Sequence, residues 1–323
     1  MEINPARHSA KTGIAEEWQH NLPNLDACRL PYTGDRQFKK YPRLIAPADG
    51  CCFHDVDGRA VLDSASGLVG SRFGHNRPEI IEAMTGQPHV LDHVPPFQFG
   101  HSPVFDLACV QRDIMPDGLD QTFFTNSGRE SVETALKMAH AYGRLKERPN
   151  GRDRWYHGAN SGGASVGGIG LNRKMYGSLA EADHLHHTLL AESTFSRGIP
   201  GQGIELAEEF EEIIALHDAS RFSAVILDPV SVSGGVIIPP DGCFNRIREI
   251  CDKHEVLLIL DEVITGFGRT GAAFGGDRID AIPDIVTVTK NLTIAVAHGT
   301  HTRALIDLDR VSRRLRKIFS TIK

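Results

Sequence analysis

The stretch LILDEVITGFGRTG (residues 258–271) joins an apolar run to two adjacent acids and then to a turn rich in glycine. An apolar run of this kind predicts a buried strand, and a buried carboxylate is costly unless a cation or hydrogen-bond donors meet it. Asp261 and Glu262 therefore need partners. Downstream, DIVTVTKNLT (284–293) ends a second strand-like run with Lys290. Strands that each end in an ionisable residue are typical of active sites in open α/β sheets.

Strand and helix patterns alternate on both sides of this stretch. QTFFTNSGRESVETALKMAHAYGRLK (121–146) predicts a strand, a glycine turn and a long helix. Strand-like AVILDPV (224–230), helix-like CFNRIREICDKH (243–254) and strand-like VLLILDEV (256–263) follow. This alternation predicts βαβ units and a largely parallel sheet. Near the start of the chain, GCCFHDV (50–56) and AVLDSA (60–65) flank a turn and predict a hairpin.

The composition narrows the class of protein. The chain has 323 residues, 41% of them hydrophobic, and a formal net charge of −6, which argues against a general affinity for nucleic acid. No apolar run approaches the length of a membrane span, so we expect no membrane segment. The six cysteines form no CxxC pair, and we expect reduced thiols in a cytoplasmic protein.

Four places in the sequence could carry chemistry, and each has a structural alternative. TNSGRE (125–130) is a strand-to-helix turn whose backbone N–H groups can bind phosphate, although such turns also simply cap helices. Asp261 could instead be a helix cap or a satisfied core acid, and Lys290 a solvated strand end. WYHG (155–158) offers aromatic rings for stacking on a ligand or for ordinary packing.

Taken together, the four places match what pyridoxal phosphate requires: a phosphate cradle, an aromatic ring to stack on, an amine and a carboxylate. Lys290 would form the Schiff base, and Asp261 would hold the pyridinium nitrogen protonated. A ring N–H⁺ would also explain why Asp261 is buried. A weaker alternative, a metal site at HLHH (184–187), lacks supporting carboxylate or cysteine spacing, so we expect no metal.

The sequence resembles the class III pyridoxal-phosphate aminotransferases, most closely their β-alanine (ω-amino acid)–pyruvate branch. The matching stretches, from about residue 28 to Thr293, are PYTGDRQFKKYPRL, PPFQFGH, FFTNSGRESVETALKMA, YHG, SVGGIGLNRKMYG, ALHDAS, IIPPDG and LILDEVITGFGRTGAAF. The resemblance implies fold type I, with a mostly parallel sheet, helices on both faces and a small domain that is incomplete here. It also implies transfer of an amino group from an ω-amino acid or amine, such as β-alanine, to pyruvate, by a homodimer or higher homo-oligomer.

The resemblance assigns a role to each candidate residue. Lys290 carries the cofactor and acts as the general acid and base, and Asp261 pairs with the pyridine nitrogen. Val263 packs against one face of the ring and Tyr156 stacks on the other. The other cofactor-binding residues would be Ser127, Gly128, Arg129 and His157, with Gly128 and Arg129 offering backbone amides to the phosphate.

Several positions depart from the family pattern. Arg129 stands where that branch has serine, and its guanidinium could pair with phosphate directly. Asp228-Pro229 replaces Glu-Pro, and Val69 replaces the tryptophan after GL, which opens the expected substrate pocket. The lysine motif reads TKNLT where Lys-Gly-Leu-Thr is usual. Val69 and Asp228 are thus the expected substrate-pocket residues.

The end of the chain departs further. The residues after Thr293 no longer match, and from residue 303 they are strongly basic with apolar residues at helical spacing. Such a tail could dock on a membrane or an acidic partner, but a frame change or truncation is the simpler interpretation. We expect a loop-rich N-terminal segment (1–75), a large cofactor-binding domain (76–300) and a divergent tail (301–323), with the family's C-terminal domain absent. The alternative function is therefore an impaired or inactive remnant that at most binds the cofactor or a partner.

Overall fold

The computed structural model describes residues 24–31, 33–95, 97–146, 161–167, 182–194, 197–290 and 302–306, the last five by their backbone. The chain divides into two compact units, Met1–Asp92 and His93–Lys323. Helix α4 (Pro78–Val90) falls within the first unit, although we expected the large domain to begin at residue 76.

The first unit is built on a small antiparallel sheet with the order β1-β2-β3. Strands β2 (Cys52–Asp55) and β3 (Ala60–Leu62) form the hairpin that the sequence predicts. Strand β1 (Ile45–Asp49) was not predicted, because it contains Pro47 and proline is disfavoured at most strand positions. Pro47 is accepted here because β1 lies at the edge of the sheet. Within its described residues, the helical segments of this unit are α2 (Asp35–Lys40), the short turn α3 (Ser66–Val69) and α4.

The second unit contains a five-stranded sheet within the part of the chain that the structure describes, in the order β4-β8-β7-β6-β5. Its strands are β4 (Gln121–Thr125), β5 (Ala224–Leu227), β6 (Leu257–Asp261), β7 (Ile285–Val288) and β8 (Thr302–Ile306). Strands β5, β6 and β7 are mutually parallel, and β8 is antiparallel to both β7 and β4. Four of the five strands therefore run in one direction, and the predicted mostly parallel sheet is confirmed.

Strand β8 lies in the region that we expected to be a divergent tail. Its five residues pair along their whole length with β4 on one side, and four of them also pair with β7 on the other. Without β8, the facing edges of β4 and β7 would carry unpaired backbone groups, so the pairing satisfies both strands. The rest of the predicted amphipathic tail, residues 307–323, lies outside the described residues.

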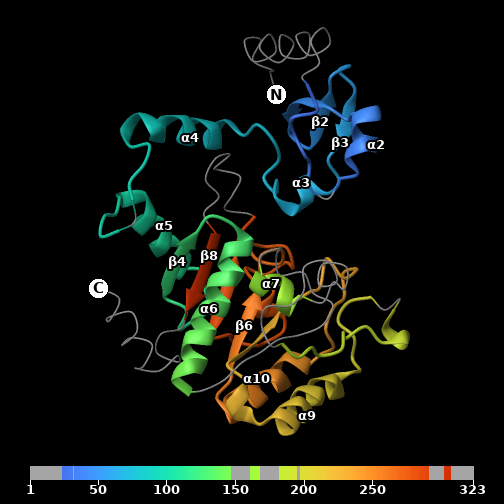
Figure 1. Cartoon of the computed structure of the whole chain (residues 1–323), viewed down its shortest axis with the longest axis vertical. Helices are drawn as coiled ribbons and strands as arrows, with labels where there is room; N and C mark the ends of the chain where they lie inside the picture. The colour runs from blue at the N-terminus through green and yellow to red at the C-terminus, as the bar shows by residue number, and fades with distance from the viewer. Residues whose placement is uncertain are drawn as a thin grey trace. The chain divides into compact units, whose positions relative to one another are not determined.

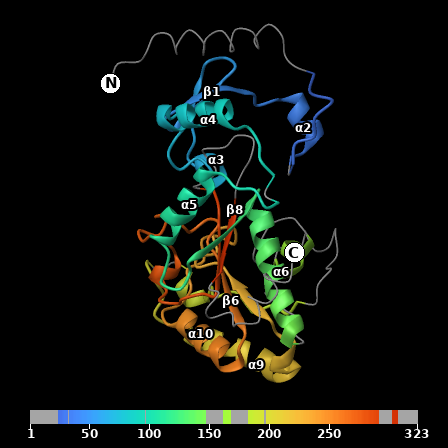
Figure 2. The ribbon, with the colours of Figure 1, turned by 90° about the vertical axis from the view of Figure 1, so that its left-hand side faces the viewer.

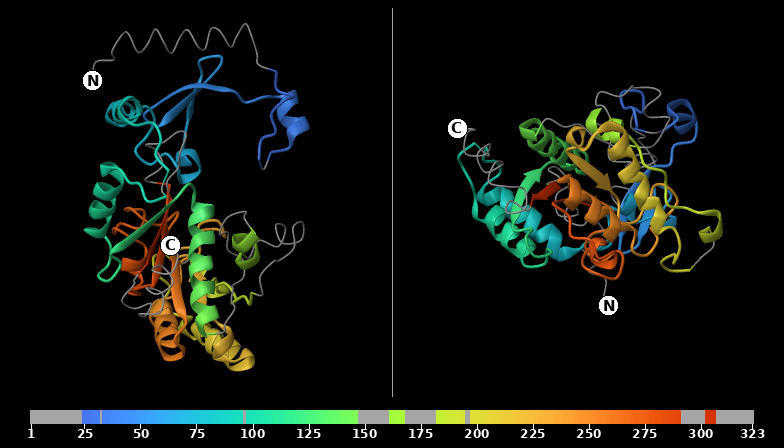
Figure 3. Two further views of the ribbon diagram at one scale, coloured as in Figure 1. Left: turned by 60° about the vertical axis from the view of Figure 1, so that its left-hand side comes forward. Right: turned by 90° about the horizontal axis from the view of Figure 1, so that it is seen from below.

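Helices cover both faces of this sheet, as predicted. Alternate side chains of each strand point to opposite faces. Ala224 and Ile226 of β5 pack with helix α6 (Gly128–Lys146), whereas Val225 and Leu227 pack with α9 (Glu208–His217) and α10 (Cys243–His254). Figure 1 shows α6 in green running along the sheet. In Figure 2, α6 and α5 (Ser102–Arg112) lie on opposite sides of β8, and Figure 3 (left) shows the same arrangement.

Several short segments also lie in the described part of the second unit. They are α7 (Ser161–Val166), η1 (Ala191–Ser193), η2 (Ile204–Ala207), η3 (Ala219–Arg221) and η4 (Gly276–Arg278). The 3₁₀ turn η2 is followed directly by α9. Among the described residues, no helix has both the length and the apolar character needed to cross a bilayer.

Candidate active site

Asp261 and Glu262 stand at the carboxyl end of β6, in the middle of the parallel part of the sheet. Asp261 pairs in register with Thr287 of β7, and the Glu262 N–H continues the ladder by donating to the Thr287 carbonyl at 2.8 Å. Because strand side chains alternate, the two acids point to opposite faces. Asp261 follows Ile259 on the α6 face, and Glu262 follows Leu260 on the face covered by α10.

The Asp261 carboxylate is buried, with 5% of the residue exposed. Its Oδ1 accepts hydrogen bonds from the Thr287 hydroxyl at 3.0 Å and from the Val263 N–H at 3.1 Å. These donors fix the orientation of the carboxylate on the α6 face. The expectation that a buried acid here meets hydrogen-bond donors is confirmed; its pairing with a ring nitrogen stays a prediction.

Lys290 follows the adjacent strand β7, three positions beyond Thr287. It is half-buried and its φ of 53° is in the left-handed region, which is uncommon for a residue with a side chain. Such a conformation typically costs on the order of 1 kcal/mol or more and is found most often at functional sites and tight turns. Lys290 is therefore held in a sharp turn at the strand end, rather than in a straight continuation of β7.

The predicted phosphate turn begins α6 beside these two strand ends. A Cβ at Gly128 would lie 2.9 Å from Thr289 Cγ2 and 3.3 Å from Val263 Cγ1. Only glycine lets the helix start approach so closely. Gly128 thus contacts both the residue before Lys290 and the residue that donates to Asp261, so the three predicted elements converge at one place.

The helix start is organised by Ser127 and Glu130. Ser127 Oγ accepts from the Glu130 N–H at 3.3 Å, and the Glu130 carboxylate accepts from the Asn126 N–H at 2.8 Å. This reciprocal pattern resembles a capping box and shows that the turn does cap the helix. The Gly128 and Arg129 N–H groups are among the first four of α6, which have no acceptor within the helix. Arg129 is exposed.

Glu262 is buried on the opposite face, with 1% of the residue exposed. Its Oε2 accepts from the Gly275 N–H at 2.9 Å and from the Thr265 hydroxyl, and its Oε1 accepts from the Gly276 N–H at 2.6 Å. Burial is the main cause that raises the pKa of this carboxyl. The sequence predicted that it needs partners but did not identify them; the adjacent glycines Gly275–Gly276 are the signal that could have done so.

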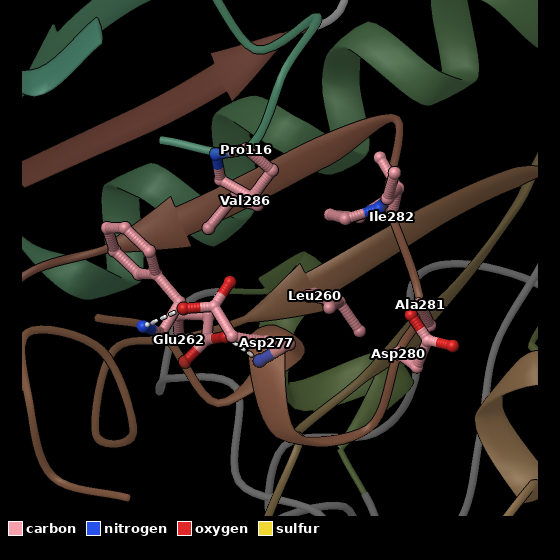
Figure 4. A pocket seen from close by; sticks show the side chains of 11 residues that line it. Pro116, Leu260, Glu262, Asp277, Asp280, Ala281, Ile282 and Val286 are labelled. Carbon is pink, nitrogen blue, oxygen red and sulfur yellow. Dashed lines mark hydrogen bonds between the residues drawn. The ribbon is translucent and has the colours of Figure 1, made fainter. Parts of the chain in front are cut away.

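A pocket of about 290 Å³ lies on the Glu262 face, and Figure 4 shows its lining. Its walls are Pro116, Leu260, Glu262, Phe274, Gly276, Asp277, Asp280, Ala281, Ile282, Pro283 and Val286. Asp261, Lys290 and Gly128 do not line it. The pocket is therefore separate from the place where the predicted cofactor residues converge.

The two expected substrate-pocket residues lie in different units. Asp228 is buried directly after β5, with 9% exposed, so it shares the carboxyl edge of the sheet with Asp261. Val69 ends the turn α3, in which Ser66, Leu68 and Val69 all have positive φ. Their contact with a substrate stays a prediction.

The Val69 turn is held from within its own unit by Asp63. Asp63 Oδ1 accepts from the Gly67 N–H at 2.9 Å, and Oδ2 lies 2.9 Å from His75 Nε2. The Gly67 bond is the main reason that the pKa of Asp63 is lowered. These contacts stabilise a left-handed turn that a β-branched residue would otherwise avoid.

Two predicted features remain: the aromatic pair Tyr156 and His157, and the histidine run 184–187. Tyr156 and His157 lie outside the described residues. In the histidine run, the His186 N–H donates to the Glu209 carboxylate at 2.7 Å and its ring also contacts Glu209. Within the described part of the chain, no group of three or more histidine, cysteine, aspartate or glutamate residues is placed to hold a metal ion.

Comparison with known proteins gives consistent matches. The family model described as "Aminotransferase class-III" matches residues 33–315. The omega-aminotransferase of Caulobacter vibrioides is 49% identical over 84% of this chain and 64% of its own length. The omega-amino acid–pyruvate aminotransferase of Pseudomonas putida is 48% identical over 83% of this chain and 62% of its own. The chain thus spans less than two thirds of these curated relatives.

Solved structures share the fold. The (S)-enantioselective omega-transaminase of Thermomicrobium roseum superposes with a TM-score of 0.81 at 30% identity, covering 100% of this chain and 70% of that one. An amine transaminase from an uncultivated Pseudomonas species, crystallised in its PLP-bound form, superposes with a TM-score of 0.80 at 33% identity, covering 88% and 66%. The predicted fold type I is therefore confirmed.

Proposed function

Because the chain belongs to the class-III aminotransferase family, we propose that it transfers an amino group from an ω-amino acid or amine to pyruvate, with pyridoxal phosphate as its cofactor. Support for the donor class comes from relatives at 48% identity named omega-amino acid–pyruvate and beta-alanine–pyruvate aminotransferase. The observation that carries the proposal is the convergence of Asp261, the Lys290 turn and the start of α6.

The residues present fit the cofactor. The backbone at Gly128 approaches Val263 and Thr289 so closely that a Cβ would fill the space, as expected for a turn that offers N–H groups to a phosphate. The dipole of α6, which is 19 residues long, favours a negative charge at this end. Asp261 supplies a buried, oriented acceptor for a ring N–H⁺, and Lys290 supplies a primary amine at the next strand end.

Each residue has a defined task in the proposed reaction. When bound, pyridoxal phosphate supplies an electron-withdrawing ring that eases loss of a proton from the carbon bearing the amino group. Asp261 would keep a proton on the ring nitrogen, which that withdrawal requires. Lys290 would hold the cofactor and then accept and return the proton of the substrate carbon at Nζ. Val263 would lie against the ring, and Tyr156 and His157 complete the set by resemblance.

The proposal extends to the partners and the compartment. Substrate selection would involve Asp228 and Val69, the latter smaller than the tryptophan that the related branch has there. We propose a homodimer or higher homo-oligomer, supported by the exposed apolar side chains of the second unit between residues 97 and 123: Phe97, Phe99, Phe105, Val110, Ile114 and Phe123. The six free thiols support a reducing compartment such as the cytoplasm.

Reduction of the cofactor onto the protein tests this proposal. After addition of pyridoxal phosphate and then borohydride, peptide mapping should find the label on Lys290, and Lys290→Ala should abolish it. Lys253→Ala, which removes a lysine paired with Glu211 on the surface of α10, is the matched control and should leave the label unchanged. Alanine formation from β-alanine and pyruvate is measured on the same samples. A label elsewhere would contradict the site, and a Lys290 label without alanine formation would favour the non-catalytic alternative.

A further inference from the structure

The loop after β6 is closed at its base by one residue. Residues 263–274 leave the strand at Val263 and return at Phe274, and Glu262 contacts both ends of this excursion. Its carbonyl accepts from the Gly266 N–H at 3.0 Å, and its carboxylate accepts the Gly275 and Gly276 N–H groups. Figure 4 shows the contact between the Glu262 carboxylate and the Gly276 N–H as a dashed line.

The closure depends on very close backbone approaches. A Cβ at Gly275 would lie 2.7 Å from Pro229 Cβ and 3.1 Å from Glu262 Oε2. A Cβ at Gly276 would lie 3.1 Å from Leu260 Cδ1. The segment Gly275–Gly276 is therefore packed between the end of β6 and Pro229, which follows the candidate substrate residue Asp228.

The loop also has internal order. The Gly268 N–H donates to the Ala273 carbonyl at 3.1 Å, and the rings of Phe267 and Phe274 meet edge to face at 5.3 Å. At the other end of the loop, Val263 donates to Asp261 and lies against the start of α6. Displacement of the loop base would thus be transmitted to the residue that orients Asp261.

We propose that Glu262 is a positioning residue for the candidate active site: its carboxylate fastens Gly275 and Gly276 to the end of β6 and thereby fixes Val263 and Asp261. The proposal rests on the proposed function, because it concerns the same cofactor site. Glu262 does not contact that site itself, since it points to the other face of the sheet. A carboxylate is suited to this task because all three donors need an acceptor, whereas an amide would present N–H to at least one of them.

The first test measures the loop directly, without cofactor. Arg269 is exposed within the loop and gives a trypsin site, while exposed Arg221 in η3 gives an internal reference. Glu262→Gln should increase cleavage after Arg269 about tenfold relative to Arg221, the effect of leaving one buried donor without an acceptor. Thr265→Val, which removes only the hydroxyl donor, should increase cleavage after Arg269 about threefold. This variant replaces Glu262→Gln in the test if Glu262→Gln does not fold. Glu249→Gln, a paired surface carboxylate on α10, should have no effect.

The second test asks whether the loop positions the cofactor site. In the same variants, the dissociation constant of pyridoxal phosphate should rise about tenfold for Glu262→Gln, and the pH titration of the bound cofactor's absorbance should shift, because Asp261 is displaced. Ile250→Val, in the core of α10, lowers stability by a comparable amount and should leave both readouts unchanged.

The outcomes separate the two proposals. Wild-type cleavage after Arg269 in Glu262→Gln would overturn the tether. Faster cleavage with wild-type cofactor affinity and absorbance titration would overturn the positioning role. Failure of the wild-type chain to bind pyridoxal phosphate would refute the proposed function, and the trypsin experiment would still decide the tether.

Discussion

Asp261 and Glu262 are neighbours in sequence and are almost equally buried, yet their surroundings differ completely. Asp261 lies on the α6 face, beside Val263, which lies against the start of that helix, and it pairs with Thr287 on the strand that leads to Lys290. Glu262 faces the opposite side, where backbone N–H groups and a hydroxyl meet both of its oxygens. Asp261 lies on the face of the candidate site, whereas the carboxylate of Glu262 is hydrogen-bonded to the loop that follows β6.

The difference shows that burial of an acid does not by itself indicate chemistry. The face of the sheet on which the acid lies indicates whether it could take part in chemistry. At the carboxyl end of parallel strands, the turns that follow several strands come together on one face of the sheet. Glu262, whose pKa is raised by burial, would be singled out by electrostatics alone. The proposed chemical role belongs instead to its neighbour Asp261, and four substitutions can break or sharpen this comparison.

The largest expected effect is on amino transfer. Asp261→Asn should slow the reaction of the cofactor-loaded protein with β-alanine about a hundredfold, because the ring nitrogen loses its charged partner. Glu262→Gln should slow it about tenfold, as the indirect effect of a loosened loop. Stopped-flow absorbance after mixing with β-alanine measures both rates, and thermal unfolding confirms that both variants fold. Equal rates in the two variants, or a slower Glu262→Gln, would reverse the comparison.

A matched pair of glycine variants tests the two faces separately. Gly128→Ala places a methyl group against Thr289 and Val263 at the candidate phosphate turn, and should weaken pyridoxal phosphate binding about tenfold. Gly275→Ala meets the rigid ring of Pro229 at 2.7 Å and should cost about 1–3 kcal/mol in the free energy of unfolding. Because the side chains near Gly128 can rotate away, its cost in stability should be smaller.

Cofactor titration and urea unfolding of both glycine variants give the two quantities. The expected order is stronger loss of binding for Gly128→Ala and stronger loss of stability for Gly275→Ala. The opposite order in either measurement would contradict the assignment of cofactor binding to the Asp261 face of the sheet and of structural support to the Glu262 face.

The sequence predicted most of the central fold because its signals are local. Apolar runs with turn signals identified β5, β6 and β7, and the helix-like stretch between β5 and β6 identified α10. Strand β8 was missed, since Thr302–Ile306 has only a short apolar run and owes its place to strands far away in the sequence. Strand β1 was missed because Pro47 argues against a strand unless its edge position is known.

The candidate site was predictable in its members but not in its arrangement. Asp261 and Lys290 were found because each ends an apolar run, and Gly128 because it lies between a strand and a helix. That Gly128 contacts the neighbours of both residues depends on how α6 lies across the sheet, which no local pattern encodes. The hydrogen-bond partners of Glu262 were not predicted, since Gly275 and Gly276 approach it only after the loop closes.

The smallest expected effect is on the pH dependence of the free energy of unfolding, to which the ionisation of Glu262 contributes. Burial raises the pKa of Glu262 above its ordinary value of 4.5, so the folded protein holds that proton more tightly than the unfolded chain does. Its contribution to stability is fully present below that ordinary value and is lost as pH rises through the folded pKa. The slope for one proton cannot exceed about 1.4 kcal/mol per pH unit.

Urea unfolding of the wild type and of Glu262→Gln, at several pH values from about 5 to about 8, isolates this contribution, because the variant lacks the titrating group. The stability of the wild type minus that of the variant should decrease as pH rises. Glu249→Gln, whose carboxylate is largely exposed, controls for general effects of removing a charge, and should give a nearly constant difference. A difference that increases with pH would mean that the three donors outweigh burial. The burial of Glu262 would then not dominate its titration, contrary to the contrast drawn between the two faces.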